Sequence, residues 1–123
     1  MSRNHLDLGA EGEARAAAHL RRRGYRIVAR NVRAGGVEID LIARRGRTVV
    51  FVEVKTRRSQ RAGRPEEAVD ARKRERLVRG AASWLRAHPA RTRTARFDVI
   101  VCELDPGAHW RLRHIPAAFD AGD

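Results

Sequence analysis

Four charged side chains lie within an otherwise apolar stretch, residues 37–55, which reads VEIDLIARRGRTVVFVEVK. They are Glu38, Asp40, Glu53 and Lys55. Burying such groups is costly unless they are paired or bound to something. Magnesium and similar hard cations take carboxylate oxygens together with waters and phosphate oxygens. A lysine beside them can orient a water or neutralise a phosphate, so these residue types indicate metal-assisted hydrolysis of a phosphodiester.

The spacing of the four residues brings them together if the stretch forms a hairpin. We expect a two-residue turn with Gly46 in its first position. In that register Asp40 faces Glu53 and Glu38 faces Lys55, so all four charges share one face. A shift of one residue would separate the acids onto opposite faces. The charged face also carries Ile42, Val49 and Phe51, and the opposite face carries Val50, Val52 and Val54.

The paired carboxylates have two interpretations. Two carboxylates directly opposed on neighbouring strands repel each other, and a divalent cation between them would offset that repulsion. The second interpretation is a plain salt bridge between Glu53 and Lys55 on a solvated face, with the valine face as the only buried side. Because Val49 and Phe51 share the charged face, the combination favours a site.

Two further charged residues are candidates for the same site. Glu13 has helical spacing with Ala10, Ala17 and Leu20, so it lies on the apolar stripe of the first predicted helix. It is there either because the helix dipole favours an acid near the N-terminus or because it is a further metal ligand. Lys73 begins the second predicted helix, where a cation is mildly unfavourable. Lys73 either contacts a phosphate or is simply solvated, and the sequence leaves both alternatives open.

Hydrophobic periodicity and turn residues predict two helices and five strands. The order α-β-β-β-α-β-β indicates an α/β protein with a mixed central sheet flanked by helices. The 123 residues suffice for a single domain, residues 1–123, with flexible ends expected at 1–8 and 120–123. Asp70 is expected to cap the second helix. The helices are expected over 9–22 and 71–87, and the strands over 25–31, 37–44, 48–56, 96–104 and 110–115.

The charge of the chain indicates an anionic partner. The formal net charge is +12, which points to nucleic acid first and to an anionic membrane surface only second. An alternative is that the host favours arginine, because only Lys55 and Lys73 among the 27 basic residues are lysines. That bias makes the two lysines more informative, since each suggests a place where a compact ammonium is needed.

The remaining polar residues give weaker signals. Two basic loops, 57–64 and 91–96, are expected to be flexible and to contact a nucleic-acid backbone. The five histidines show no metal-ligand spacing, so we expect solvated or capping roles for them. Trp84 and Trp110 are expected in the core rather than stacked on bases. The arginines expected to bind nucleic acid in the first loop are Arg57, Arg58, Arg61 and Arg64.

The sequence also indicates a compartment. No apolar stretch is long enough to span a bilayer, and the N-terminal residues lack the apolar core of a signal peptide. The single cysteine, Cys102, excludes an internal disulfide framework and fits a reducing compartment. We therefore expect a cytoplasmic protein without membrane association. Cys102 lies in the apolar run FDVIVCEL and is expected to be a buried, inert thiol.

The chain resembles the YraN-like family of small bacterial proteins over roughly residues 9–119. That family is similar to the archaeal Holliday-junction resolvases, and so to the PD-(D/E)XK nuclease superfamily. The resemblance rests on three segments. They are GAEGEARAAAHLRRRGYRIVARNVRAGGVEIDLIARRGRTVVFVEVKTR, EEAVDARKRERLVRGAASWL and FDVIV, which contain the family's Arg30-Asn31, Glu38-Ile39-Asp40, Lys73 and Phe97-Asp98.

The resemblance implies a restriction-endonuclease-like core and a metal site. Asp40 and Glu53 would correspond to the metal-binding acids, Lys55 to the catalytic lysine, and Glu13 to the acid that resolvase-like members carry on the first helix. The metal would be Mg²⁺ or Mn²⁺. Ile39 stands where many superfamily members have proline, which resolvase-like members tolerate. Glu38 is offered only as a partner for Lys55.

Three functions are compatible with these residues. The first is a metal-dependent endonuclease that acts on DNA, with branched or damaged DNA as the class to test. The second is a nucleic-acid-binding module of the same fold without turnover. The third is a structural or interaction protein whose charge reflects the composition of its host. Because resolvases act as dimers, the resemblance also implies a homodimer.

Overall fold

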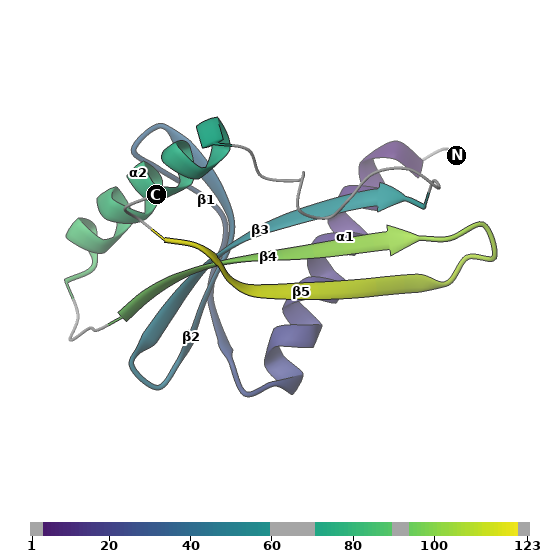
Figure 1. The fold of residues 1–123 in the computed structure, drawn as a ribbon, viewed down its shortest axis with the longest axis horizontal. Coiled ribbons are helices and arrows are strands. Elements are labelled where there is room, and N and C mark those ends of the chain that lie inside the picture. Colours follow the sequence, from purple (N-terminus) through teal and green to yellow (C-terminus); the bar gives the residue numbers. More distant parts are fainter. Residues whose placement is uncertain (1–3, 60–70, 90–93, 121–123) are drawn as a thin grey trace.

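The computed structural model describes residues 4–59, 71–89 and 94–120, with side chains described from residue 8 onward. The two helices and five strands follow the predicted order (Figure 1). No helix in these ranges is long and apolar enough to cross a membrane. The elements are α1 Asn4–Arg22, β1 Arg26–Ala34, β2 Val37–Arg45, β3 Thr48–Arg58, α2 Ala71–Ala87, β4 Thr94–Leu104 and β5 Trp110–Phe119.

The predicted boundaries hold to within a few residues. Helix α2 has the predicted bounds, whereas α1 begins at Asn4 rather than at residue 9. Strand β5 continues through Pro116 to Phe119, because an edge strand can accommodate a proline without losing a ladder hydrogen bond. The expected cap Asp70 lies outside the described residues, as do parts of both chain ends that were expected to be flexible.

The five strands form one sheet in the order β1-β2-β3-β4-β5. Neighbouring strands are antiparallel except β3 and β4, which are parallel. A parallel pair needs a long crossover connection, and α2 lies in the connection between β3 and β4. This mixed sheet flanked by helices matches the restriction-endonuclease-like α/β core that the sequence predicts.

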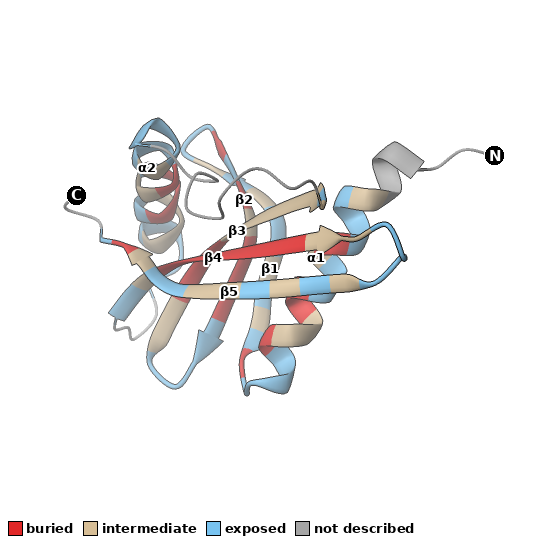
Figure 2. Cartoon of the chain, turned by 45° about the vertical axis from the view of Figure 1, so that its right-hand side comes forward, coloured by how far each residue is buried: buried red, intermediate tan, exposed pale blue. Residues whose placement is uncertain are grey.

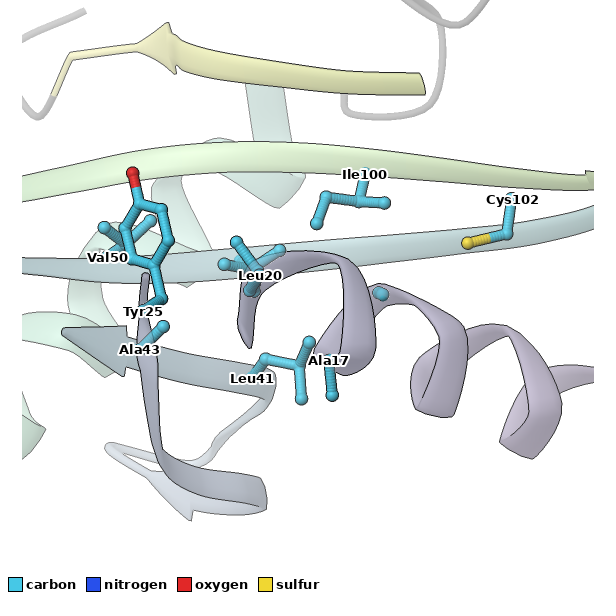
Figure 3. Close-up of a cluster of buried hydrophobic side chains, with 10 residues drawn as sticks. Ala17, Leu20, Tyr25, Leu41, Ala43, Val50, Ile100 and Cys102 are labelled. Carbon is cyan, nitrogen blue, oxygen red and sulfur yellow. The ribbon is translucent and has the colours of Figure 1, made fainter. Parts of the chain in front are cut away.

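Both faces of the sheet are buried. Helix α1 covers one face, where Ala17 and Leu20 pack against residues such as Val50 (Figure 3). Helix α2 covers the other face, where Leu77 packs in a cluster with Phe51. Phe51 and Val50 are neighbours on β3 that point to opposite faces, and both are fully buried. The interpretation in which the valine face is the only buried side is therefore wrong.

Burial falls toward the edges of the sheet. Figure 2 shows buried residues along β4, whereas the edge strands β1 and β5 are exposed or intermediate over nearly their whole length. Cys102 lies on β4 and is fully buried, as predicted, and burial raises the pKa of its thiol to about 11. A thiol in this state is not a nucleophile at neutral pH.

Close contacts at two glycines set the height of the helices above the sheet. A Cβ added at Gly12 of α1 would collide with Oγ1 of Thr56 on β3. A Cβ added at Gly80 of α2 would lie 3.1 Å from the Cβ of Val37 on β2. The absence of side chains at these two positions therefore lets α1 and α2 approach the strands that carry the charged residues.

Candidate functional site

The hairpin of β2 and β3 has the predicted turn and register. Gly46 adopts a left-handed backbone conformation with φ 62°, as the first position of such a turn requires. The cross-strand pairs run from Arg45 opposite Thr48 to Leu41 opposite Val52. The register prediction is therefore confirmed over these five pairs.

The ladder between β2 and β3 ends at the pair Leu41 and Val52, just before the acids. Beyond that point β2 remains paired only with β1, and β3 remains paired only with β4. The two strands thus separate in a fork, with Asp40 and Glu53 at its opening. The predicted cross-strand pair of Asp40 with Glu53 lies beyond the ladder and does not form as a backbone pair.

The alternation of β2 between the two faces shifts by one residue at Asp40. Ile39 and Ile42 both pack in the cluster on the α2 side, whereas Leu41 packs on the α1 side. Asn31 of β1 lies opposite this point, between residues that pair with Leu41 and Ile39, and has φ 48°. The regular alternation predicted for residues 38–42 is therefore wrong, because the strand is irregular where it carries the acid.

Asp40 is held in place by the backbone of the neighbouring strand. The amide of Val54 donates a hydrogen bond of 2.8 Å to Oδ2 of Asp40. Burial raises the pKa of Asp40 from 3.8 to about 7, with further upward contributions from the charges of Glu53, Glu13 and Glu38. The hydrogen bond from Val54 lowers the pKa and offsets part of this shift. A carboxyl group with such a pKa can take up or release a proton near neutral pH.

Glu53 has a different balance of charges around it. Burial raises its pKa, and the charges of Glu13 and Glu38 act in the same direction. Lys73 and Lys55 lower the pKa, with Lys73 exerting the larger effect. The structure therefore brings the predicted acids and both lysines within electrostatic reach of one another, from α1, β2, β3 and α2.

A cavity of about 160 Å³ opens beside Glu53. Helix α2 provides one wall, through Lys73, Arg76 and the buried Leu77. The sequence reasoning missed Arg76, although its position three residues after Lys73 on one helix would place the two on neighbouring turns. The full lining is Val37, Glu38, Glu53, Lys73, Arg76 and Leu77.

The predicted partnership of Glu38 with Lys55 does not form. The ion pairs among the described residues do not include one between these two side chains. Glu38 instead lines the cavity with Glu53, because β2 has already left β3 at this point. Lys55 is half-buried and acts on Glu53 through its charge.

The arginines expected to contact nucleic acid fall into different surroundings. Arg57 donates a hydrogen bond of 3.0 Å to Glu103, and Arg58 is exposed at the end of β3. Arg61 and Arg64 lie outside the described residues. Arg96, at the end of the second predicted loop, is part of β4 and points to Asp98, so the expectation of a flexible loop is wrong for this residue.

The expectation of solvated or capping histidines is only partly correct. His88 lies just after α2, where its Nδ1 is 2.9 Å from the carbonyl oxygen of Trp84, as in a cap. His19 and His114 are instead partly buried, and their rings contact each other at 3.1 Å. Sequence spacing could not reveal this pair, because the two residues come from α1 and β5.

The chemistry of the donors fits a hard cation. Asp40 and Glu53 offer carboxylate oxygens in a partly buried setting where their charges repel, and a cation would relieve that repulsion. In the described ranges no three His, Cys, Asp or Glu side chains are grouped closely enough to hold a metal by themselves. Magnesium commonly needs only one or two protein carboxylates, with waters and phosphate oxygens as its other ligands.

Comparison with known proteins identifies the family. The chain matches the model of the Uncharacterised protein family UPF0102 over residues 12–102. A UPF0102 protein of Nitratidesulfovibrio vulgaris (strain DP4) is 50% identical over 112 residues, covering 91% of this chain and 83% of the relative. One of Symbiobacterium thermophilum is 49% identical over 114 residues, covering 93% and 97%. One of Geobacter metallireducens is 42% identical over 120 residues, covering 98% of each chain. The chain therefore belongs to the UPF0102 family, the YraN-like family that its sequence resembles.

Proposed function

We propose that this protein is a metal-dependent endonuclease that hydrolyses phosphodiester bonds of DNA. The observation that carries the proposal is the pair of half-buried carboxylates, Asp40 and Glu53, at the fork between β2 and β3. Burial raises the pKa of both groups, and nearby carboxylates raise it further, with Glu53 acting on Asp40 and Glu13 and Glu38 acting on both. Such an arrangement destabilises the fold, and proteins tolerate it mainly where the groups serve a function.

Asp40 and Glu53 would hold Mg²⁺ or Mn²⁺, with Glu13 assisting from α1. A bound metal of this kind lowers the pKa of a coordinated water and stabilises negative charge on a phosphate. Lys55 lies two residues after Glu53 on the same strand, so it would orient a water or neutralise a phosphate oxygen. Lys73 would neutralise charge on the substrate from the opposite side of the cavity.

The choice of DNA rests on charge and on the family resemblance. The net charge of +12 favours binding of a polyanion. Contacts between basic side chains and phosphates add salt-dependent affinity without selecting a sequence. Arg57, Arg58, Arg61 and Arg64 would contact the backbone beside the site. A homodimer and a cytoplasmic location are part of the proposal, the first by likeness to the resolvases and the second because a single buried thiol suits a reducing compartment.

A second candidate function is a nucleic-acid-binding module without turnover. It is favoured by the net charge of +12, which supports binding of a polyanion whether or not the site holds a metal. In that case the same basic surface would bind DNA, and the acids would give the site no cleavage activity.

The deciding experiment is a titration of Mg²⁺ and Mn²⁺ against linear, single-stranded, flapped and four-way DNA. A nuclease cuts at least one of these in a metal-dependent way, and Asp40→Asn or Lys55→Ala abolishes the cutting. Glu11→Gln is the matched control, because Glu11 lies near Glu13 on α1 but is exposed. Binding without cutting, equal in wild type and both variants, would establish the binding module instead. If the protein does not bind DNA even at low salt, the remaining function is that of a structural or interaction protein.

A further inference from the structure

Asp98 of β4 is the only charged side chain in the described ranges that is fully buried. Arg96 donates to both of its oxygens, each at 2.8 Å, and the amide of Ala117 donates at 3.0 Å. Although burial raises the pKa of Asp98, the hydrogen bonds from Arg96 and His114 lower it to about 2. Asp98 is therefore a permanently ionised acceptor at any physiological pH.

The same carboxylate orients the ring of His114 on β5. Nε2 of His114 lies 2.7 Å from Oδ2 of Asp98. Because an ionised carboxylate can only accept, Nε2 of His114 must carry a proton. In the neutral ring Nδ1 of His114 is then an acceptor, and it faces Nε2 of His19 at 3.1 Å. His19 is in the last turn of α1, so two imidazoles join a helix to an edge strand.

The number of protons on the two rings decides whether this contact can exist. With two neutral rings, Nε2 of His19 donates to Nδ1 of His114. A third ring proton, added at the outer nitrogen of His19, leaves the contact intact. A fourth proton would set one N–H against another across 3.1 Å and place two cations side by side. The pair can therefore hold three protons but not four.

Burial and nearby charges oppose a positive charge on His19. Burial lowers the pKa of His19 below its ordinary value of 6.5, and the charges of His114, Arg23 and Arg22 lower it further. Facing His114 from β4 are Asp98 and, beyond it, Arg96. A histidine whose pKa is lower in the fold than in the unfolded chain stabilises the fold above about pH 6.5, and this stabilisation is lost as the pH falls.

We propose that the contact between His19 and His114 is a pH-sensitive link between the last turn of α1 and strand β5. This contact breaks when both rings are protonated. The opening is local. The first half of α1 is held to β3 at the close contact of Gly12 with Thr56, which contains no titratable group. This inference does not rest on the proposed nuclease activity.

Amide hydrogen exchange on the intact chain tests the proposal, at about pH 7.5 and about pH 5, with intrinsic exchange rates corrected. We expect protection in the last turn of α1 and in β5 around His114 to fall about tenfold or more at the lower pH. Protection near Gly12 should stay unchanged. In His19→Gln the amide can donate through its nitrogen to Nδ1 of a neutral His114 and accept through its oxygen from a protonated one, so protection should become independent of pH.

The control is His109→Gln, which removes an exposed histidine of the turn between β4 and β5 and should keep the wild-type pH dependence. Nitrogen NMR of the imidazoles in the wild type gives a second readout that needs no variant. Uptake of the last proton by the pair should occur below the pH of an exposed histidine. Equal pH dependence in His19→Gln and wild type, or independent titration of the two rings, would overturn the proposal.

Discussion

The backbone amide of Val54 donates a hydrogen bond of 2.8 Å to Oδ2 of Asp40 across the fork between β2 and β3. A side chain here takes the place of the backbone carbonyl that an uninterrupted ladder would supply. The bond satisfies the amide of β3 and fixes the direction of the carboxylate. The acid is thus built into the sheet at the point where two strands separate.

Asp40→Asn is expected to stabilise the protein at alkaline pH. The raised pKa means that the unfolded chain loses this proton before the folded chain does, so the stability falls as the pH rises from about 4 to about 7. Asparagine keeps an oxygen for Val54 and carries no charge. We expect the free energy of unfolding to rise by about 1–3 kcal/mol at about pH 8 and to be unchanged at about pH 4. Urea denaturation at the two pH values measures this, and a less stable variant at about pH 8 would contradict the burial of a charged Asp40.

Divalent metal is expected to stabilise the wild type. At a free concentration of about 100 times Kd, Mg²⁺ or Mn²⁺ should add about 2.7 kcal/mol, visible as a rise in Tm. The effect should be larger at about pH 8 than at about pH 6, because metal and proton compete for Asp40. Glu13→Gln should weaken it, and the exposed Glu11→Gln should not. An equal rise in Asp40→Asn would show that the metal binds elsewhere.

Asn31 is expected to tolerate glycine but not a branched residue. Its backbone has φ 48°, a conformation that asparagine and glycine adopt far more readily than valine. Asn31→Val should lower the free energy of unfolding by about 1–3 kcal/mol, and Asn31→Gly should change it little. Arg30→Val, at the exposed neighbouring position, is the control. Chemical denaturation measures these free energies of unfolding. Equal losses of stability in Asn31→Val and Arg30→Val would show that the left-handed backbone at Asn31 is not the cause.

The contact of Gly12 with Thr56 is expected to show strong coupling. Gly12→Ala should destabilise the protein by about 1–3 kcal/mol, because the new Cβ collides with Thr56. Thr56→Ala removes Oγ1 and Cγ2, which are two of the three atoms nearest to a Cβ at position 12. The Cβ of residue 56 stays 2.9 Å from that Cβ, so the second substitution should restore only part of the lost stability. A double-mutant cycle should give a coupling of about 1 kcal/mol. Gly9→Ala, on the same helix with nothing within 4 Å, should be neutral or stabilising, and a loss there equal to that of Gly12→Ala would point to a general helix effect.

Much of the fold was accessible from local patterns. The periodicity of α2 predicts its bounds, and Gly46 predicts the turn and hence the five cross-strand pairs that follow. The alternation of the hairpin also singles out Asp40 and Glu53, because charges in an apolar run stand out without any structure. These features depend on residues a few positions apart.

The details of the site were not accessible in the same way. A regular strand would place Ile39 on the same face as Leu41 and Glu38 beside Lys55, and neither arrangement occurs. The left-handed backbone at Asn31, on another strand, accompanies the shift at Asp40. Similarly, Arg76 lines the cavity from α2, which approaches β2 closely at Gly80.

By itself the sequence determined the order of the elements, the register of the central hairpin and the identity of the acids, because spacing and turn chemistry act between near neighbours. Only the tertiary structure decided where β2 leaves β3, since beyond that point β2 stays paired with β1 and β3 with β4, and these pairings join residues far apart in the chain. The same is true of the pair His19 and His114, whose rings are 95 positions apart in the chain and meet only when α1 packs beside β5.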